Sequence, residues 1–138
     1  MAKVLLSLAA NRFQKSNLAK ARQCLGEVLS DIYYTSEQWT EPLSTARRDK
    51  YLNQLAFGTT ALTLDELNAR LKQIETSLRR TPQKRVMGIV PIDIDILLYD
   101  GERLHQRDWQ RPYVTALLEE LQHEVNTEEC NKNTSSAL

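Results

Sequence analysis

The sequence predicts an α+β fold in which helices cover one face of a largely antiparallel sheet. Three features indicate it: an apolar run at the start, two segments with apolar residues at helical spacing, and an alternating segment at residues 91–99. In chain order they give strand, helix, strand, strand, helix and strand. That is the βαββαβ order of a ferredoxin-like sandwich, and an additional C-terminal helix follows it.

The first half of the chain predicts a helix and three strands. Residues 3–10 are a short apolar run typical of a buried central strand. Ser16 or Asn17 is placed to cap the next helix, whose apolar stripe is Leu18, Ala21, Leu25 and Val28. Residues 31–43 and 51–60 are rich in β-branched and aromatic residues, so we expect a hairpin with an irregular polar loop at 44–49.

The second half predicts two further helices. Thr63 and Glu66 have the spacing of a capping box, and an apolar stripe follows at Leu64, Leu67, Leu71, Ile74 and Leu78. Pro82 interrupts a basic segment at residues 79–85, so we expect the helix to stop there and a loop to begin. A last helix starts at Arg111 or Pro112. We expect one domain over residues 1–123 and an irregular polar tail over 124–138.

Composition limits the classes of function. The chain has 138 residues with 18 basic and 18 acidic side chains, which argues against broad electrostatic binding to nucleic acid. No apolar run is long enough to span a membrane, and the N-terminus lacks a signal-peptide profile. Cys24 and Cys130 have no metal-ligand spacing. We expect a cytoplasmic protein that is a monomer or a weak homodimer.

Asp93 and Asp95 are the first candidate site. In a strand over residues 91–99 they lie on one face, about 7 Å apart by the rise of a strand. Two like charges so placed repel each other, and a divalent cation resolves the repulsion. Magnesium is held by one or two carboxylates, with water and substrate phosphates completing its shell. The spacing alone leaves a solvated strand face open as the alternative.

The neighbouring residues resemble a known family. The segment reads Gly88-Ile-Val-Pro-Ile-Asp93-Ile-Asp95-Ile-Leu97, and Tyr51-Leu52-Asn53 precedes it. Both are similar to motifs of the 6-hydroxymethyl-7,8-dihydropterin pyrophosphokinases of folate synthesis, and the resemblance extends from about residue 3 to residue 121. It implies transfer of pyrophosphate from ATP to the pterin. It also implies that Asp93 and Asp95 hold two magnesium ions.

The same resemblance implies roles for other side chains. Tyr51, Asn53 and Tyr113 correspond to residues that bind the pterin, and Asn11 is the residue retained from a motif after the first strand. The implied nucleotide-binding residues are Glu75, Arg80 and Arg111, with Arg80 also catalytic. Physical chemistry agrees, because offset stacking of a flat heterocycle on tyrosine contributes roughly 0.5–1.5 kcal/mol beyond buried area.

Some positions depart from the family pattern. Val90 and Pro82 stand where the family has phosphate-side arginines, and Met87 replaces an aromatic residue. We therefore expect a slow pyrophosphokinase. The alternative is a diverged module that binds a pterin or nucleotide with little or no catalysis. An RNA-binding ferredoxin-like domain is disfavoured by the neutral charge and by the lack of a strand rich in aromatic residues.

Overall fold

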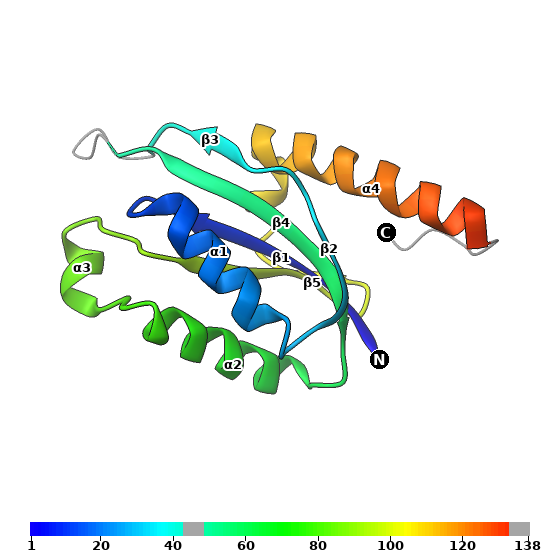
Figure 1. Ribbon diagram of the computed structural model, residues 1–138, viewed down its shortest axis with the longest axis horizontal. Coiled ribbons are helices and arrows are strands. Elements are labelled where there is room, and N and C mark those ends of the chain that lie inside the picture. Colours follow the sequence, from blue (N-terminus) through cyan, green and yellow to red (C-terminus); the bar gives the residue numbers. More distant parts are fainter. Residues whose placement is uncertain (43–48, 133–138) are drawn as a thin grey trace.

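The computed structural model describes residues 1–42 and 49–132, with side chains described up to residue 123 (Figure 1). Within these residues, six strands pair antiparallel in one sheet, ordered β2-β4-β1-β5-β6, while β3 also pairs with β4. The strands are β1 (Ala2–Ala10), β2 (Ser30–Tyr34), β3 (Gln38–Thr40), β4 (Tyr51–Thr60), β5 (Asp93–Tyr99) and β6 (Glu102–Arg103). The predicted α+β class is confirmed.

Helices cover both faces of the sheet. They are α1 (Gln14–Leu25), α2 (Leu64–Ser77), α3 (Pro82–Val86) and α4 (Pro112–Lys132), with a 3-10 turn η1 (Asp108–Gln110) before α4. Figure 1 shows α1 and α2 together on one side and α4 on the other. We expected helices on one face only, but α4 covers part of the other face. No helix of the described residues is both long and apolar enough to cross a membrane.

Strand alternation divides the core in two. The even-numbered residues of β1, with Ile94 and Ile96 of β5, pack against α1 and α2 through leucines such as Leu18, Leu25, Leu67 and Leu71. On the opposite face, Leu5, Leu55, Phe57 and Leu97 pack against Val114, Leu117 and Leu121 of α4. Because α4 begins at Pro112, its apolar stripe reaches only one end of this face. The other end carries polar side chains, described below.

The predicted start of the first helix is wrong. Helix α1 begins at Gln14, and Phe13 occupies the N-cap position with a left-handed backbone (φ 45°) and no side-chain capping bond. Asn17 lies inside the helix, where its Nδ2 donates to the carbonyl oxygen of Arg12 at 2.7 Å. Its side chain therefore satisfies a carbonyl of the preceding loop instead of capping the helix.

The capping box of α2 is confirmed, whereas the loop predicted at Pro82 is wrong. The Glu66 amide donates to Thr63 Oγ1 at 3.2 Å, and the Thr63 amide donates to Glu66 Oε1 at 3.0 Å. Pro82 starts the short helix α3, because a proline at the first helical position has no N–H to leave unpaired. Thr81 caps α3 by accepting from the Lys84 amide at 3.2 Å.

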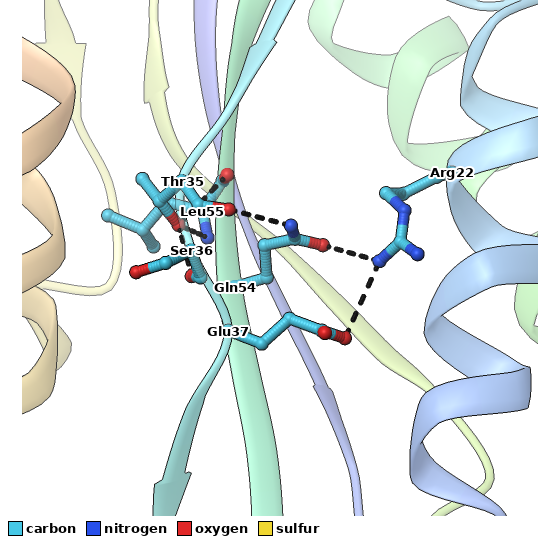
Figure 2. Close-up of polar contacts among 6 residues, drawn as sticks. All are labelled: Arg22, Thr35, Ser36, Glu37, Gln54 and Leu55. Atoms are coloured by element: carbon cyan, nitrogen blue, oxygen red, sulfur yellow. Dashed lines mark hydrogen bonds and ion pairs between the residues drawn. The ribbon is translucent and has the colours of Figure 1, made fainter. Parts of the chain in front are cut away.

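The strand predicted at residues 31–43 is split into β2 and β3 at residues 35–37. Thr35 causes the split, because its hydroxyl takes the place of a backbone acceptor: Oγ1 accepts from the Leu55 amide at 2.9 Å. Gln54 supports the segment by donating from Nε2 to the Thr35 carbonyl at 2.7 Å (Figure 2). Residues 43–48, most of the predicted polar loop, lie outside the described residues.

The segment between β2 and β3 is held from both faces of the sheet. From α1, Arg22 Nη1 donates to Gln54 Oε1 at 2.9 Å and lies 3.6 Å from Glu37 Oε2 (Figure 2). From α4, Glu120 accepts from the amide and the hydroxyl of Ser36 at 2.6 and 2.7 Å. We call residues 35–37 with these partners the β3 anchor, because β3 follows directly.

At the C-terminal end, α4 continues to Lys132, past residue 124 where we expected an irregular tail to begin. Polar residues can continue a helix that has already formed, since extending a helix costs much less than starting one. Residues 133–138 lie outside the described residues.

Candidate functional site

A cavity of about 450 Å³ opens on the α4 face of the sheet, beside the first turn of α4. Its walls come from β1, β3, β4, β5 and the turn before α4. The lining residues are Ser7, Ala9, Gln38, Thr40, Glu41, Tyr51, Asn53, Asp93, Asp95, Asp108, Arg111, Pro112 and Tyr113. We call it the main cavity.

The strand register explains why a hollow forms here. Ala9 of the central strand pairs with Asn53 on one side and with Asp93 on the other. One step along, Ser7 lies between Leu55 and Asp95. Residues paired across strands have Cβ atoms about 4.5–5.5 Å apart, so these rows share one surface. Small side chains in the middle and longer ones on both sides make a floor with walls.

Asp93 and Asp95 both line the main cavity. Burial raises the pKa of Asp95 to about 7, and repulsion from Asp93 and then from Asp108 adds to the effect. A carboxyl group in this position holds a proton near neutral pH unless a cation replaces it. The pair is therefore electrostatically arranged to receive positive charge.

Arg80 does not line the main cavity, but it contacts Asp93, which does. Its Nη1 is 2.7 Å from Asp93 Oδ1 and 2.8 Å from Glu75 Oε2. The same Glu75 oxygen accepts from the Ile94 amide at 2.8 Å. Burial raises the pKa of Glu75, while the Ile94 amide and Arg80 act in the opposite direction. Glu75 thus accepts a hydrogen bond from a backbone amide of β5 and orients Arg80. It does not line the cavity.

Asn53 presents a defined atom to the main cavity. Its side chain is buried, and Nδ2 donates to the Gln38 carbonyl at 3.0 Å and to Thr40 Oγ1 at 2.8 Å. Among the hydrogen bonds of the described residues, none reaches Asn53 Oδ1. Both N–H groups of the Asn53 side-chain amide donate to β3, so the side-chain oxygen Oδ1 is the atom that Asn53 can offer to a ligand.

Tyr51, Arg111 and Tyr113 complete the predicted set in the main cavity. Tyr51 is the first residue of β4, and Tyr113 is the second residue of α4. Arg111 is held by Asp108, with Nε 3.2 Å from Asp108 Oδ1. Asp108 was not among the residues predicted from the sequence. Its three-residue spacing from Arg111 is the signal that could have suggested a charged pair on one turn.

Asn11 does not lie in the main cavity. Its Nδ2 donates to the Gly88 carbonyl at 2.8 Å, and its Oδ1 accepts from the Val90 amide at 2.6 Å. Its own amide donates to the Val90 carbonyl at 2.9 Å. Asn11 therefore fixes the backbone of the segment that leads from α3 to β5.

A smaller cavity of about 250 Å³ lies on the opposite side of β5, against α2 and the segment after β6. It is lined by Leu64, Asp65, Asn68, Ile94, Asp95, Ile96, Leu104 and His105. Asp95 lines both cavities. This residue of β5 therefore lies between the two cavities.

A metal at this site would depend on few protein ligands. Among the described residues there is no group of three or more His, Cys, Asp or Glu side chains that could hold a metal ion. Two carboxylates suit magnesium when it is bound together with substrate phosphates, since magnesium keeps several water or phosphate oxygens. The donor set thus fits a magnesium site that is completed by a phosphorylated ligand.

Comparison with known proteins agrees with this chemistry. Residues 5–123 match the family model described as 7,8-dihydro-6-hydroxymethylpterin-pyrophosphokinase (HPPK). A "Folate synthesis bifunctional protein" of Arabidopsis thaliana is 34% identical over 90 residues, covering 59% of this chain and 19% of that protein. A mitochondrial "Folate synthesis bifunctional protein" of Pisum sativum is 37% identical over 90 residues, covering 59% of this chain and 17% of that protein.

The chain thus matches less than a fifth of the length of either relative. Among solved structures, Bacillus subtilis GlnK aligns with a TM-score of 0.34 and 10% identity, over 70% of this chain and 85% of that one. A likeness this weak carries no argument about fold or function.

Proposed function

The chain belongs to the 7,8-dihydro-6-hydroxymethylpterin-pyrophosphokinase family, and on that basis we propose that it transfers pyrophosphate from ATP to 6-hydroxymethyl-7,8-dihydropterin. The products are AMP and the pterin diphosphate, an intermediate for folate synthesis. The observation that carries the proposal is that Asp95 lines both cavities, with Asp93 next to it on β5. Two substrates bound on either side of β5 then meet at a pair of carboxylates.

Asp93 and Asp95 are the residues that would hold two magnesium ions. Bound magnesium supplies neutralisation of triphosphate charge and alignment of the reacting oxygens. The raised pKa of Asp95 supports this role, because a cation relieves the repulsion from Asp93 and Asp108.

The main cavity takes the pterin in this proposal. A volume of about 450 Å³ lies within the usual range for small-molecule sites. Asn53 offers Oδ1 to an N–H donor on the edge of the heterocycle, while Tyr51 and Tyr113 offer ring faces. Asn11 acts indirectly, by holding the Gly88–Val90 backbone next to β5.

The smaller cavity takes part of the nucleotide, and arginines take its phosphates. Arg80 is already directed toward Asp93, so its guanidinium lies close to any phosphate bound at that carboxylate. Glu75 keeps Arg80 in this place instead of binding the nucleotide itself. Arg111, held by Asp108, lines the main cavity itself and offers a second guanidinium to the phosphates.

The reaction needs no nucleophile from the protein. The hydroxymethyl oxygen of the pterin forms a bond to the β-phosphorus of ATP, and the bond from that phosphorus to the α-phosphate oxygen breaks. AMP leaves and the hydroxyl proton is released. The chain contributes orientation and charge, which is where most catalysis of phosphoryl transfer comes from.

We also propose a specific fold for the chain. The order β2-β4-β1-β5, with α1 and α2 on one face, supports a ferredoxin-like βαββαβ sandwich to which β3, β6 and α4 are added. A single domain over residues 1–123, a monomeric or weakly dimeric state and a cytoplasmic setting stay predictions.

A direct test is the nucleotide product formed with magnesium, ATP and the hydroxymethyl pterin, followed by phosphorus NMR. We expect AMP and pterin diphosphate in equal amounts from the wild type, and neither from an Asp95→Asn variant of unchanged fold. Formation of ADP would show a different transfer. Tight binding of both substrates without any AMP would favour the non-catalytic binding module.

A further inference from the structure

We propose that the chain carries a second ligand site, which binds a phosphate-bearing small molecule on the helical side of the molecule. The site is a cavity of about 350 Å³ between the start of α1, the end of α2 and the segment before β5. Four basic side chains line it, together with Phe13 and Leu78; the four are Arg12, Lys20, Arg79 and Lys84. We call it the basic cavity.

The charge of the basic cavity is one-sided. Among the described residues, no Asp or Glu lines it. Residues 12–22 contain Arg12, Lys15, Lys20 and Arg22 with no acidic residue, and residues 79–86 contain Arg79, Arg80, Lys84 and Arg85 with none. The whole chain is formally neutral, so this concentration of positive charge is local. Folding brings the two basic segments to opposite sides of one hollow.

Contacts within the fold leave most of this charge without a counter-ion. No described carboxylate forms an ion pair with Arg12, Lys20, Arg79 or Lys84. Lys84 donates from Nζ to the Arg79 carbonyl at 3.0 Å, and the Arg12 guanidinium lies over the Phe13 ring at 5.3 Å. Like charges held together repel, and a bound anion removes the repulsion as a cation does for Asp93 and Asp95.

Arg79 and Arg80 show that this site is separate from the main cavity. Arg80 is bound to Glu75 and Asp93, whereas Arg79, the preceding residue, lines the basic cavity. Arg79 has a left-handed backbone (φ 68°) just after the last turn of α2. The basic cavity shares no lining residue with the main cavity. The inference therefore goes beyond the proposed transfer reaction.

The lining also indicates the kind of ligand. Guanidinium and ammonium groups are the donors that bind phosphate oxygens most strongly. Leu78, Ile89 and Pro91 add apolar surface, and Phe13 is 70% exposed beside them. This combination suits a small molecule that carries phosphate on an apolar or aromatic body.

Calorimetric titration of the full chain with inorganic pyrophosphate tests the proposal. The titration is done near physiological ionic strength and without divalent cations, because the carboxylates of the main cavity then repel the anion. We expect saturable binding of one pyrophosphate. An Arg12→Gln/Lys20→Gln variant should bind at least about tenfold more weakly. The matched control is Lys15→Gln/Lys72→Gln, which removes the same charge outside the cavity and should change the affinity less than about twofold.

Amide shifts in NMR spectra locate the bound anion. Binding in the basic cavity predicts shifts at Leu78 and Ile89 that saturate with the calorimetric isotherm. Equal weakening in both double variants would overturn the proposal, and so would shifts centred on Asp95 and Tyr113. Absence of saturable binding up to millimolar pyrophosphate would also overturn it, and would mean that Arg79 and Lys84 serve the C-terminal dipole of α2. None of these outcomes depends on pterin or ATP turnover.

Discussion

Burial and the acidic neighbours of Asp95 raise the pKa of its carboxyl group from 3.8 to about 7. The unfolded chain therefore loses this proton at lower pH than the folded chain does. Between about pH 4 and pH 7 the folded state binds more protons, so this group makes the free energy of unfolding fall as pH rises. Well above pH 7 the group is deprotonated in both states, and its destabilising effect no longer grows with pH.

Asp95→Asn should remove this dependence. We expect the variant to be more stable than the wild type at pH 7.5 by about 1–2 kcal/mol, less than the full shift would give because the carboxyl group is partly solvated. Urea unfolding at several pH values measures it. Asp100→Asn, at an exposed position, is the control. If the free energy of unfolding changes with pH in the same way for wild type and Asp95→Asn, the pKa of Asp95 is not raised by folding.

Tyr113 is predicted to act through its ring. Tyr113→Ala should weaken pterin binding by about 1–3 kcal/mol, whereas Tyr113→Phe keeps the stacking surface and should stay close to wild type. Calorimetry with the pterin measures both. If both variants lose the same pterin affinity, the hydroxyl group of Tyr113 and not its ring binds the pterin. If neither variant loses affinity, Tyr113 does not contact the pterin.

Residue-scale prediction succeeded where local periodicity decides the outcome. Asp93 and Asp95 share a face because strand alternation is a local property, and the same rule places Tyr51 and Asn53 together on β4. Asn11 shows the limit. Its side-chain partners are 77 and 79 residues away in sequence, so no local pattern reports that its amide is already used by Gly88 and Val90.

At the scale of elements, the β3 anchor links the two helical layers to the main cavity. Glu120 of α4 holds Ser36, and β3 then takes both donors of the Asn53 amide. Glu120→Ala should therefore loosen β3 and weaken pterin binding by about three- to tenfold, while magnesium-dependent ATP binding changes little. Glu119→Ala is the neighbouring exposed control.

Separate titrations with pterin and with magnesium-ATP measure the effect of Glu120→Ala. Equal weakening of both ligands would indicate general destabilisation instead of a role for β3. The split between β2 and β3 could not be predicted, because a Thr35 hydroxyl that replaces a backbone acceptor leaves no trace in the hydrophobic pattern. The start of α3 was predictable in principle, since Thr81-Pro82 has the order of an N-cap followed by a first-turn proline.

At the scale of the whole molecule, two separate groups of basic residues lie at two different sites. Arg80 and Arg111 serve the main cavity, while Arg79 and Lys84 line the basic cavity and cannot replace the missing phosphate-side arginines at Val90 and Pro82. We therefore expect slow turnover that is limited by the chemical step. An arginine that stabilises a phosphoryl-transfer transition state can contribute about 10³–10⁵ in rate.

Val90→Arg should raise kcat by about tenfold or more and change the KM for pterin much less. The backbone of residue 90 can stay in place, because its N–H and C=O are bound by Asn11 and do not depend on the side chain. Steady-state rates of AMP formation measure the change. A KM effect as large as the kcat effect would contradict the assignment to the chemical step.

The central claim is that Asp93 and Asp95 bring nucleotide and metal to the junction of the two cavities. The most direct measurement is ATP affinity with and without magnesium for the wild type, Asp93→Ala, Asp95→Ala and the control Asp100→Asn. We predict magnesium-dependent binding in the wild type and the control, and its loss in both alanine variants while their thermal unfolding stays cooperative. Unchanged magnesium-dependent ATP affinity in the two alanine variants would contradict the account.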